Sequence, residues 1–211
     1  MAKIYLVRHA ESIANTEGRY QGHTYDTDLS ILGQQQARAL ADHLIAYRIT
    51  KVIVSPLRRT YQTGLIIAKR KGIPIIAELR LIETNHGTWE GQTKKEITRN
   101  WPTLYKMWTL HPSVVQFPEG EKFLETQNSV INWWIEIKDT SENLLVVTHD
   151  NIVRIIIAYI FGLHLDNMWR FHLDPTAVTL IERNKNGDRL LCLNDNRHLG
   201  GLDSNLATHA L

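Results

Sequence analysis

The sequence is poor in several features that mark specialised proteins. Its 211 residues include a single cysteine, Cys192, which excludes an internal disulfide framework and is typical of a reducing compartment. The formal net charge is only +2 and the basic residues are scattered, so we expect no nucleic-acid partner. The longest uncharged apolar stretch, IIIAYIFGL at residues 155–163, is far shorter than the roughly 20 residues that cross a bilayer, and we expect no membrane partner. The first residues, MAKIYLVRHAES, lack the pattern of a secretory signal, and these absences together predict a cytoplasmic protein.

The composition is otherwise that of an ordinary globular protein. Hydrophobic residues make up 43% and charged residues 22% of the chain, with no low-complexity run and no internal repeat. A chain of this length can bury a sizeable core without disulfides or a structural metal. We therefore expect one domain over residues 1–211, with a lid-like insertion at about residues 91–120, where three prolines and two tryptophans interrupt the pattern.

Apolar runs rich in β-branched residues predict strands that are buried on both faces, as in a parallel sheet. These runs are IYLV at residues 4–7, VIV at 52–54 and LLVV at 144–147. Helical periodicity is found at residues 30–47, 57–71 and 122–138. The segment AVTLIERNKNGDRLLCLND, residues 177–195, is typical of two antiparallel strands joined by an Asn-Gly turn. Together these patterns predict an α/β fold, a three-layer sandwich whose mostly parallel central sheet is flanked by helices and edged by an antiparallel strand.

Charged and polar residues directly follow three of the predicted strands. The first strand runs into RHAES, the second into SPLRRT and the later one into THDN. In open α/β sheets ligands bind outside the carboxyl ends of the strands, so we expect the side chains there to meet at one edge. They are Arg8, His9, Ser55, Arg58, His149 and Asp150. Buried guanidinium groups need an anionic partner, and their fork of N–H donors fits phosphate best.

Two residues have the chemistry that phosphoryl transfer needs. A neutral imidazole that is held through one ring nitrogen can attack phosphorus with the other, which predicts His9 as the nucleophile. A leaving alkoxide needs a proton, and we expect Glu83, in the stretch LIETNHGTWEG, to supply it. Asp150 precedes the helical run NIVRIIIAYIF, and we expect its side chain to cap that helix.

Five motifs occur in order along residues 4–151: LVRHAES, GRYQGHTYDTDLSILGQQQA, SPLRRTYQT, LIETNHGTWEG and VVTHDN. In this order they resemble the motifs of the histidine phosphatase superfamily, in the branch that contains the cofactor-dependent phosphoglycerate mutases. The resemblance implies a phosphoglycerate mutase-like fold. Two positions depart from the family pattern, because Ala10 follows the first Arg-His pair and Asp150 follows the second histidine where glycine is usual.

The resemblance also implies roles for individual residues. His9 would become phosphorylated and Glu83 would donate the proton. The phosphoryl group would be held by Arg8, Arg58 and His149, and by a phosphate loop that contains Asn15, Gln21 and Gly22. The resemblance also implies that no metal is needed, and we expect no cofactor for this chain. The implied reaction has two steps, phosphohistidine formation and then attack by water.

The resemblance is less specific about the substrate. The chain is short and its insertion modest, which favours hydrolysis over the mutase reaction. The general layout, the stretch ETNHGTWEG with His86, and the tail DNRHLGGLDSNLATHAL are most similar to the metal-independent phosphoserine phosphatases. We therefore expect a small phosphorylated metabolite as partner, phosphoserine first, with His86 among the residues that bind it.

Three alternatives stay open. They are a phosphoglycerate mutase, a phosphatase for another ester such as a sugar phosphate or α-ribazole phosphate, and a catalytically silent phosphate-binding protein. The intact set of Arg8, His9, Arg58, Glu83 and His149 argues against a silent protein. In the tail, His198 and His209 either fold over the site or fray with the C-terminus. The open edge of the last hairpin and the tryptophan-rich helix at residues 122–138 permit a homodimer.

Overall fold

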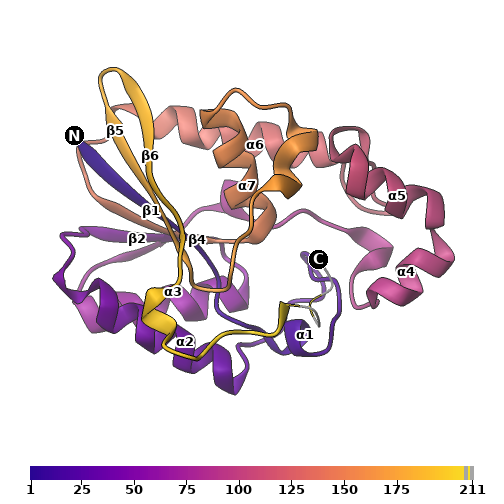
Figure 1. The fold of residues 1–211 in the computed structure, drawn as a ribbon, viewed down its shortest axis with the longest axis horizontal. Coiled ribbons are helices and arrows are strands. Elements are labelled where there is room, and N and C mark those ends of the chain that lie inside the picture. Colours follow the sequence, from indigo (N-terminus) through magenta and orange to yellow (C-terminus); the bar gives the residue numbers. More distant parts are fainter. Residues whose placement is uncertain (207–208, 210–211) are drawn as a thin grey trace.

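The computed structural model describes residues 1–206 and 209, and at its centre is a six-stranded sheet in the order β3-β2-β4-β1-β5-β6 (Figure 1). The strands are β1 (Ala2–Arg8), β2 (Lys51–Val54), β3 (Ile75–Ala77), β4 (Leu144–Thr148), β5 (Val178–Asn184) and β6 (Gly187–Asp195). The pairs β1–β4, β2–β4 and β2–β3 are parallel, whereas β5 pairs antiparallel with both β1 and β6. The predicted mostly parallel sheet with an antiparallel hairpin at its edge is confirmed.

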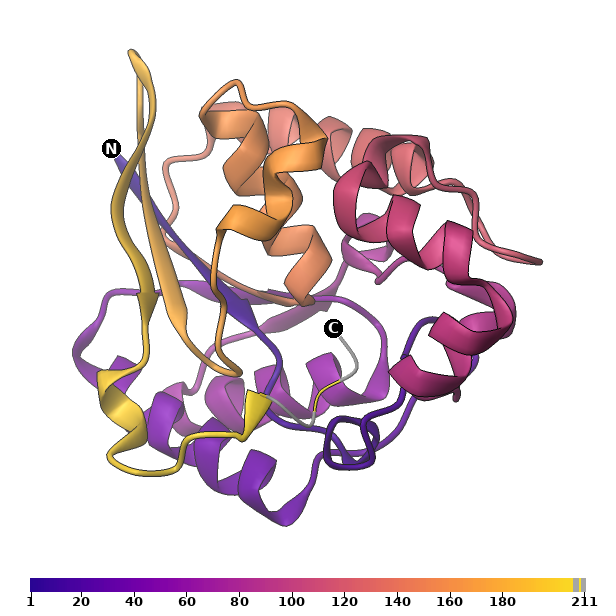
Figure 2. The same ribbon diagram turned by 45° about the vertical axis from the view of Figure 1, so that its right-hand side comes forward.

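The helices cover both faces of this sheet (Figures 1 and 2). They are α1 (Ile13–Thr16), α2 (Ile31–His43), α3 (Arg58–Lys71), α4 (Lys94–Asn100), α5 (Pro102–Leu110), α6 (Phe123–Glu136) and α7 (Asp150–Ile160). Short 3₁₀ helices lie at Leu44–Ala46, Leu79–Leu81, Gly87–Trp89, Pro112–Val114, Ile137–Asp139, Leu165–Arg170 and Arg197–Leu199. Helices α2 and α3 pack together on one face, and α6 and α7 pack together on the other.

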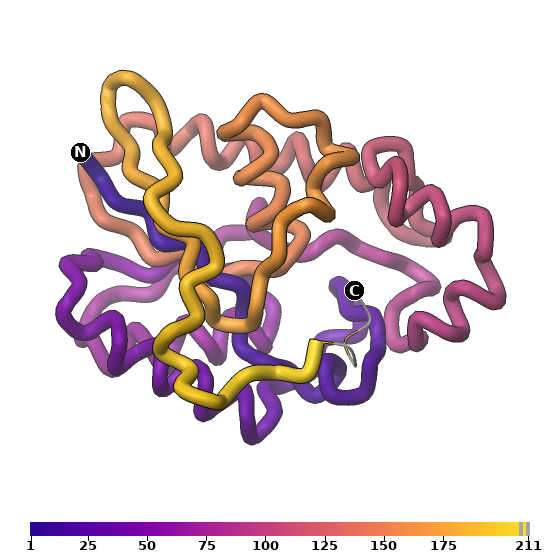
Figure 3. The backbone as a smooth tube through the Cα atoms, in the orientation of Figure 1, coloured from indigo at the N-terminus to yellow at the C-terminus, as the bar shows by residue number. Residues whose placement is uncertain are grey.

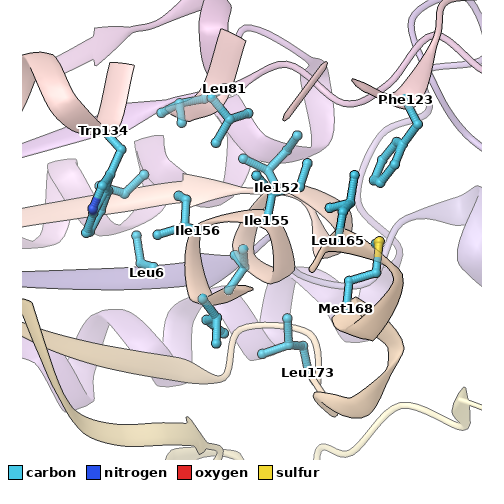
Figure 4. Packing of buried hydrophobic residues seen from close by; sticks show 14 of the residues in the cluster. Leu6, Leu81, Phe123, Trp134, Ile152, Ile155, Ile156, Leu165, Met168 and Leu173 are labelled. Carbon is cyan, nitrogen blue, oxygen red and sulfur yellow. The ribbon is translucent and has the colours of Figure 1, made fainter. Parts of the chain in front are cut away.

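Two hydrophobic cores, one on each side of the sheet, hold the layers together. Successive strand residues point to opposite faces, so Leu6 lies in the core under α6 and α7 while Val7 lies in the core with α2 and α3. Figure 4 shows the larger core, where Ile155 and Ile156 of α7 belong to the same cluster as Leu6. The predicted three-layer sandwich is confirmed.

Strand register sets the edge at which the functional side chains meet. Arg8, the last residue of β1, is paired with Thr148, the last residue of β4. The backbone N–H of His9 donates to the carbonyl of Thr148 at 2.8 Å. All five residues of β4 are buried, which accounts for its continuous apolar run. The residues that follow β1 and β4 therefore leave the sheet side by side.

The insertion at residues 91–120 contains α4 and α5, and it lies beyond the end of the sheet (Figure 2). Its side chains join an aromatic cluster, in which the ring of Phe117 lies 5.2 Å from that of Trp89 and 5.1 Å from that of Trp108. These three rings are buried. The insertion is thus packed onto the segment that follows Glu83.

After β6 the chain turns back across α2 toward the carboxyl end of β1 (Figure 3). The side-chain amide of Gln36 on α2 donates to the carbonyl of Leu202 and to Oγ of Ser204, both at 2.9 Å. None of the helices in the described residues has the length and apolar character needed to span a membrane.

Candidate active site

A small cavity lies at the carboxyl ends of β1 and β4, where the sequence predicts the functional side chains to meet. Its lining residues are Arg8, His9, Asn15, Arg19, Tyr20, Gln21, Arg59, Glu83 and Asp150. His149 lies beside it, with its ring 5.4 Å from that of His9. The structure therefore brings seven predicted residues together, namely Arg8, His9, Asn15, Gln21, Glu83, His149 and Asp150.

His9 is held in the state that a nucleophile requires. Its Nδ1 lies 2.7 Å from the carbonyl oxygen of Ala10, so Nδ1 carries the proton and Nε2 keeps its lone pair. Burial, together with the guanidinium groups of Arg59 and Arg8, holds the pKa of His9 well below its usual range. The imidazole is consequently neutral at physiological pH. The methyl group of Ala10 is fully buried, so the fold accommodates this departure from glycine.

Two buried arginines supply positive charge without being fully paired. Arg8 donates from Nη1 to the carbonyl of Leu173 at 2.8 Å, and Arg59 donates from Nη1 to Oδ1 of Asp26 at 2.8 Å. The Nε of each has no hydrogen-bond partner among the described residues, and the same holds for Nδ1 of His149. Buried polar nitrogens without partners are the mark of a site that receives an anion.

The expectation for Arg58 is corrected by the structure. Its side chain is 65% exposed, and Nη1 lies 3.6 Å from Oδ1 of Asp28. Arg59, which is 1% exposed, takes the expected place in the cavity. Both arginines begin α3, and neighbouring helix residues point about 100° apart, so only one of the pair can face the sheet edge. The signal in the sequence is the spacing of Arg59 with the buried Thr63 and Ile67, which puts all three on one helix face.

Glu83 has the environment of a proton donor. Its Oε1 accepts hydrogen bonds from the backbone N–H of Thr84 at 2.8 Å and from Nδ2 of Asn151 at 3.1 Å. The side chain is buried, and burial raises the pKa of Glu83 to about 7. Near neutral pH this group therefore holds a proton for part of the time and can both give and take one.

His149 is fixed by the strand beside it. Its Nε2 lies 2.8 Å from Oγ of Ser55, the residue that follows β2. Burial, with the nearby charge of Arg59, holds the pKa of His149 well below its usual range. His149 thus lies beside the cavity, next to His9, as a neutral imidazole.

The predicted phosphate loop is built around a partly buried carboxylate that sequence reasoning did not identify. Glu90 accepts hydrogen bonds from the backbone N–H groups of His23, Thr24, Tyr25 and His86 at 2.6 to 3.1 Å. Gly22 is not among the residues that line the cavity. A Cβ atom at this position would lie 2.0 Å from Oε1 of Glu90, so only glycine fits here. Its role in the described residues is to let Glu90 approach the loop.

His86 also lies outside the cavity lining, although we expected it to bind substrate. Its Nδ1 lies 2.7 Å from the carbonyl oxygen of Gln21, and its ring packs edge-on against Phe117 with centroids 4.6 Å apart. Burial lowers the pKa of His86 to about 4, so it is neutral. The structure therefore places His86 behind the phosphate loop, where it contacts Gln21, and its role in substrate binding stays a prediction.

The expectation that Asp150 caps its helix is wrong. The N-cap of α7 is His149, and Asp150 is the first helical residue. The carboxylate turns away from the backbone amides, and Oδ2 accepts a hydrogen bond from Nε of Arg154 at 3.0 Å. Asp150 and Arg154 are four residues apart and so lie on the same helix face. The Asp150 carboxylate therefore pairs with Arg154 instead of capping the helix.

The two tail histidines have different positions. His209 is buried, with Nδ1 at 3.3 Å from Nη2 of Arg8 and Nε2 at 3.9 Å from Oε2 of Glu11. His198 lies away from the cavity, with Nε2 at 3.1 Å from Oγ1 of Thr176. The tail resemblance also rests on residues 207–208 and 210–211, which lie outside the described residues.

Three lining residues were missed by sequence reasoning, namely Arg19, Tyr20 and Arg59. Arg19 and Tyr20 stand inside the quoted motif GRYQGH, directly before Gln21, and that adjacency was the available signal. Within residues 1–206 and 209, no group of three or more histidine, cysteine, aspartate or glutamate side chains is arranged to hold a metal ion.

Comparisons with known proteins agree with this geometry. The family model of the histidine phosphatase superfamily (branch 1) matches residues 4–196. The chain is 36% identical over 202 residues to phosphoserine phosphatase 1 of Hydrogenobacter thermophilus, covering 95% of each chain. It is 26% identical over 194 residues to the adenosylcobalamin/alpha-ribazole phosphatase of Escherichia coli, covering 91% of this chain and 95% of the relative. The solved structure of Bacillus stearothermophilus YhfR superposes with a TM-score of 0.88 at 28% identity, over 94% of this chain and 100% of that one.

Proposed function

The chain belongs to the histidine phosphatase superfamily and is a phosphatase, and from this premise we propose that it hydrolyses a small phosphate monoester, phosphoserine, without a metal ion and through a phosphohistidine on His9. The observation that carries the proposal is the pairing of two groups in one buried cavity. His9 presents a neutral imidazole with a free Nε2, and Glu83 presents a carboxyl group with a pKa of about 7.

In the first step Nε2 of His9 attacks phosphorus and the bond between phosphorus and the ester oxygen breaks. The electron pair of that bond goes to the leaving oxygen, which takes the proton of the Glu83 carboxyl group, so a neutral alcohol departs. Charge on the transferring phosphoryl oxygens is stabilised by the buried Arg8 and Arg59. The products of this step are phosphohistidine and the Glu83 carboxylate.

In the second step a water molecule attacks the phosphohistidine. The Glu83 carboxylate takes a proton from the water, the bond between Nε2 and phosphorus breaks, and inorganic phosphate leaves. The proton returns Glu83 to its starting state, and the imidazole of His9 regains its lone pair. Glu83 thus acts as an acid in the first step and as a base in the second. A pKa of about 7 suits both roles.

The substrate assignment rests on likeness in sequence. Similarity over 95% of both chains to a protein named phosphoserine phosphatase 1 favours phosphoserine. The likeness to an adenosylcobalamin/alpha-ribazole phosphatase supports a second ester as alternative. A phosphoglycerate mutase would need to shield the phosphohistidine from water, and the modest insertion of α4 and α5 favours hydrolysis instead.

A panel of esters tests this proposal. Phosphate release is measured from phosphoserine, phosphothreonine, 3-phosphoglycerate, a sugar phosphate and α-ribazole phosphate, with chelator present, and mutase activity is assayed in parallel. We expect phosphoserine to be hydrolysed fastest and the chelator to have no effect. A metal requirement, or interconversion of phosphoglycerates without hydrolysis, would overturn the proposal.

A further inference from the structure

Asp150 is a buried carboxylate that the proposed reaction does not use. Its side chain is 3% exposed, and Oδ2 accepts a hydrogen bond from Nε of Arg154 at 3.0 Å. Oδ1 has no hydrogen-bond partner among the described residues and lies 4.0 Å from Nη1 of Arg8, which is too far for a hydrogen bond. A buried carboxylate oxygen without a donor destabilises a protein, so this atom fits a ligand that brings one.

The position of Asp150 puts this oxygen at the wall between two cavities. Arg8 and Asp150 line both of them. The smaller cavity contains His9 and Glu83. The larger has a volume of about 270 Å³, and its other lining residues are Arg154, Trp169, His172, Leu173, Leu206 and His209. A phosphate ester whose phosphorus lies at His9 can therefore extend its leaving group past Asp150.

The neighbouring positive groups leave Oδ1 without a partner. Arg154 directs Nη1 to the carbonyl oxygens of Met168 and Phe171, and Arg8 directs Nη1 to the carbonyl of Leu173. In the proposed function Arg8 also becomes a counterion of the bound phosphate. Binding of the phosphate dianion therefore weakens the attraction between Arg8 and Asp150, and a cation on the leaving group restores it.

We propose, on the basis of the proposed function, that Oδ1 of Asp150 binds an ammonium group of the substrate and selects phosphate monoesters of 2-amino alcohols. Phosphoserine belongs to this class. In such an ester the ammonium stands two carbons from the oxygen that Glu83 protonates, and Glu83 and Asp150 line the same cavity. A hydroxyl group on the same carbon would bring a donor without charge, which makes a weaker bond to a carboxylate. Glycine, usual in the family at this position, would offer no side-chain acceptor.

A matched pair of substrates isolates this interaction, since L-phosphoserine and 3-phospho-L-glycerate, which has the same configuration, differ only in the ammonium or hydroxyl on one carbon. We expect the wild-type kcat/KM for phosphoserine to exceed that for 3-phosphoglycerate by about 30-fold or more. Asp150→Asn, which keeps the shape of the side chain and removes its charge, should reduce this ratio by about tenfold or more, mainly through KM for phosphoserine. Asp42→Asn, at a 65% exposed side chain paired with Arg70, is the control and should leave the ratio unchanged.

Equal losses on both substrates in Asp150→Asn would overturn the proposal, because they would mean that Asp150 only positions Arg8. A second comparison in the wild type needs no variant. Phosphoethanolamine should be preferred over 2-hydroxyethyl phosphate, and the absence of a preference would also overturn it. Hydrolysis of nitrophenyl phosphate with phosphorylation of His9 reports on the proposed function separately. If that reaction continues while both selectivities are absent, only the role of Asp150 fails; if no ester is hydrolysed, both fail.

Discussion

At the scale of residues, the neighbouring arginines Arg58 and Arg59 have different environments. Arg58 is exposed at the surface, whereas Arg59 is buried and lines the cavity. We predict that Arg59→Ala lowers kcat/KM for phosphoserine by about 100-fold or more, because the buried guanidinium lines the cavity in which we propose that the phosphoryl group is transferred. Arg58→Ala should change it by less than about threefold, since this exposed side chain pairs with Asp28 at the surface. Steady-state kinetics on both variants check the prediction. Similar losses in the two would contradict the assignment of Arg59.

Glu83 should impose a pH dependence that varies with the leaving group. The general acid must be protonated, and burial raises the pKa of Glu83 to about 7. We therefore predict that kcat/KM for phosphoserine falls as the pH rises above about 7, while kcat/KM for nitrophenyl phosphate stays nearly flat, because nitrophenolate leaves without a proton. Ionisation of the phosphate itself, near pH 6, lies below this window.

Replacement of Glu83 supplies the control for that profile. Glu83→Gln should lower kcat/KM for phosphoserine by about 100-fold or more and remove the fall at high pH, with a much smaller effect on nitrophenyl phosphate. A profile that keeps its alkaline limb in this variant would assign the titration to another group.

Residues at strand ends could be predicted from the sequence, whereas residues behind them could not. Arg8, His9 and His149 follow strands whose carboxyl ends share an edge, so their meeting follows from topology. The packing of the His86 ring among Tyr20, Trp108 and Phe117 could not be predicted, because nothing in the local sequence shows it. The choice between Arg58 and Arg59 required the rotation of α3, which its buried face reveals.

At the scale of elements, the loop at residues 20–25 depends on Glu90 for its shape. Although burial acts to raise its pKa, the hydrogen bonds from Thr24, Tyr25 and His23 lower the pKa of Glu90, so it is a carboxylate. We predict that Glu90→Gln lowers kcat/KM by about tenfold or more, because an amide accepts fewer hydrogen bonds and Gln21 loses its fixed position. Hydrogen exchange of the amides of residues 23–25 should become faster.

The control for this element is Glu142→Gln, at a half-exposed glutamate that pairs with Lys51. It should change neither the activity nor the exchange of the loop. Unchanged hydrogen exchange at residues 23–25 in Glu90→Gln would contradict the proposal that Glu90 fixes the shape of this loop, whatever the activity of the variant.

Elements with a strong apolar pattern were predictable, and weakly patterned ones were not. Strands β1, β2 and β4 and the β5–β6 hairpin match the predicted runs. Strand β3 was missed because it has three residues and its edge position leaves Ile76 49% exposed. The start of α7 was predicted one residue late, since Asp150 pairs with Arg154 instead of capping.

At the scale of the whole molecule, the fold assembles the site from segments that are far apart in the sequence. Parallel β1 and β4 bring His9 and His149 together, and the segment after the 3₁₀ helix at Leu79–Leu81 adds Glu83. The arrangement of the sheet between two helix layers could be predicted from the continuous apolar runs of the strands. Alternate residues of such a strand enter opposite cores, one on each face of the sheet. The homodimer that the hairpin edge and the tryptophan-rich helix permit stays untested. The one domain expected over residues 1–211 also stays a prediction.

The phosphorylated intermediate is the most direct test of the central claim. Enzyme mixed with radiolabelled phosphoserine is quenched within one turnover, and the phosphoryl group on the protein is located by peptide mapping. We predict an alkali-stable, acid-labile label on His9, approaching one per chain, and no label in a folded His9→Ala variant, which should not turn over. Full turnover without a phosphoenzyme, or a label on another residue, would contradict the role of His9.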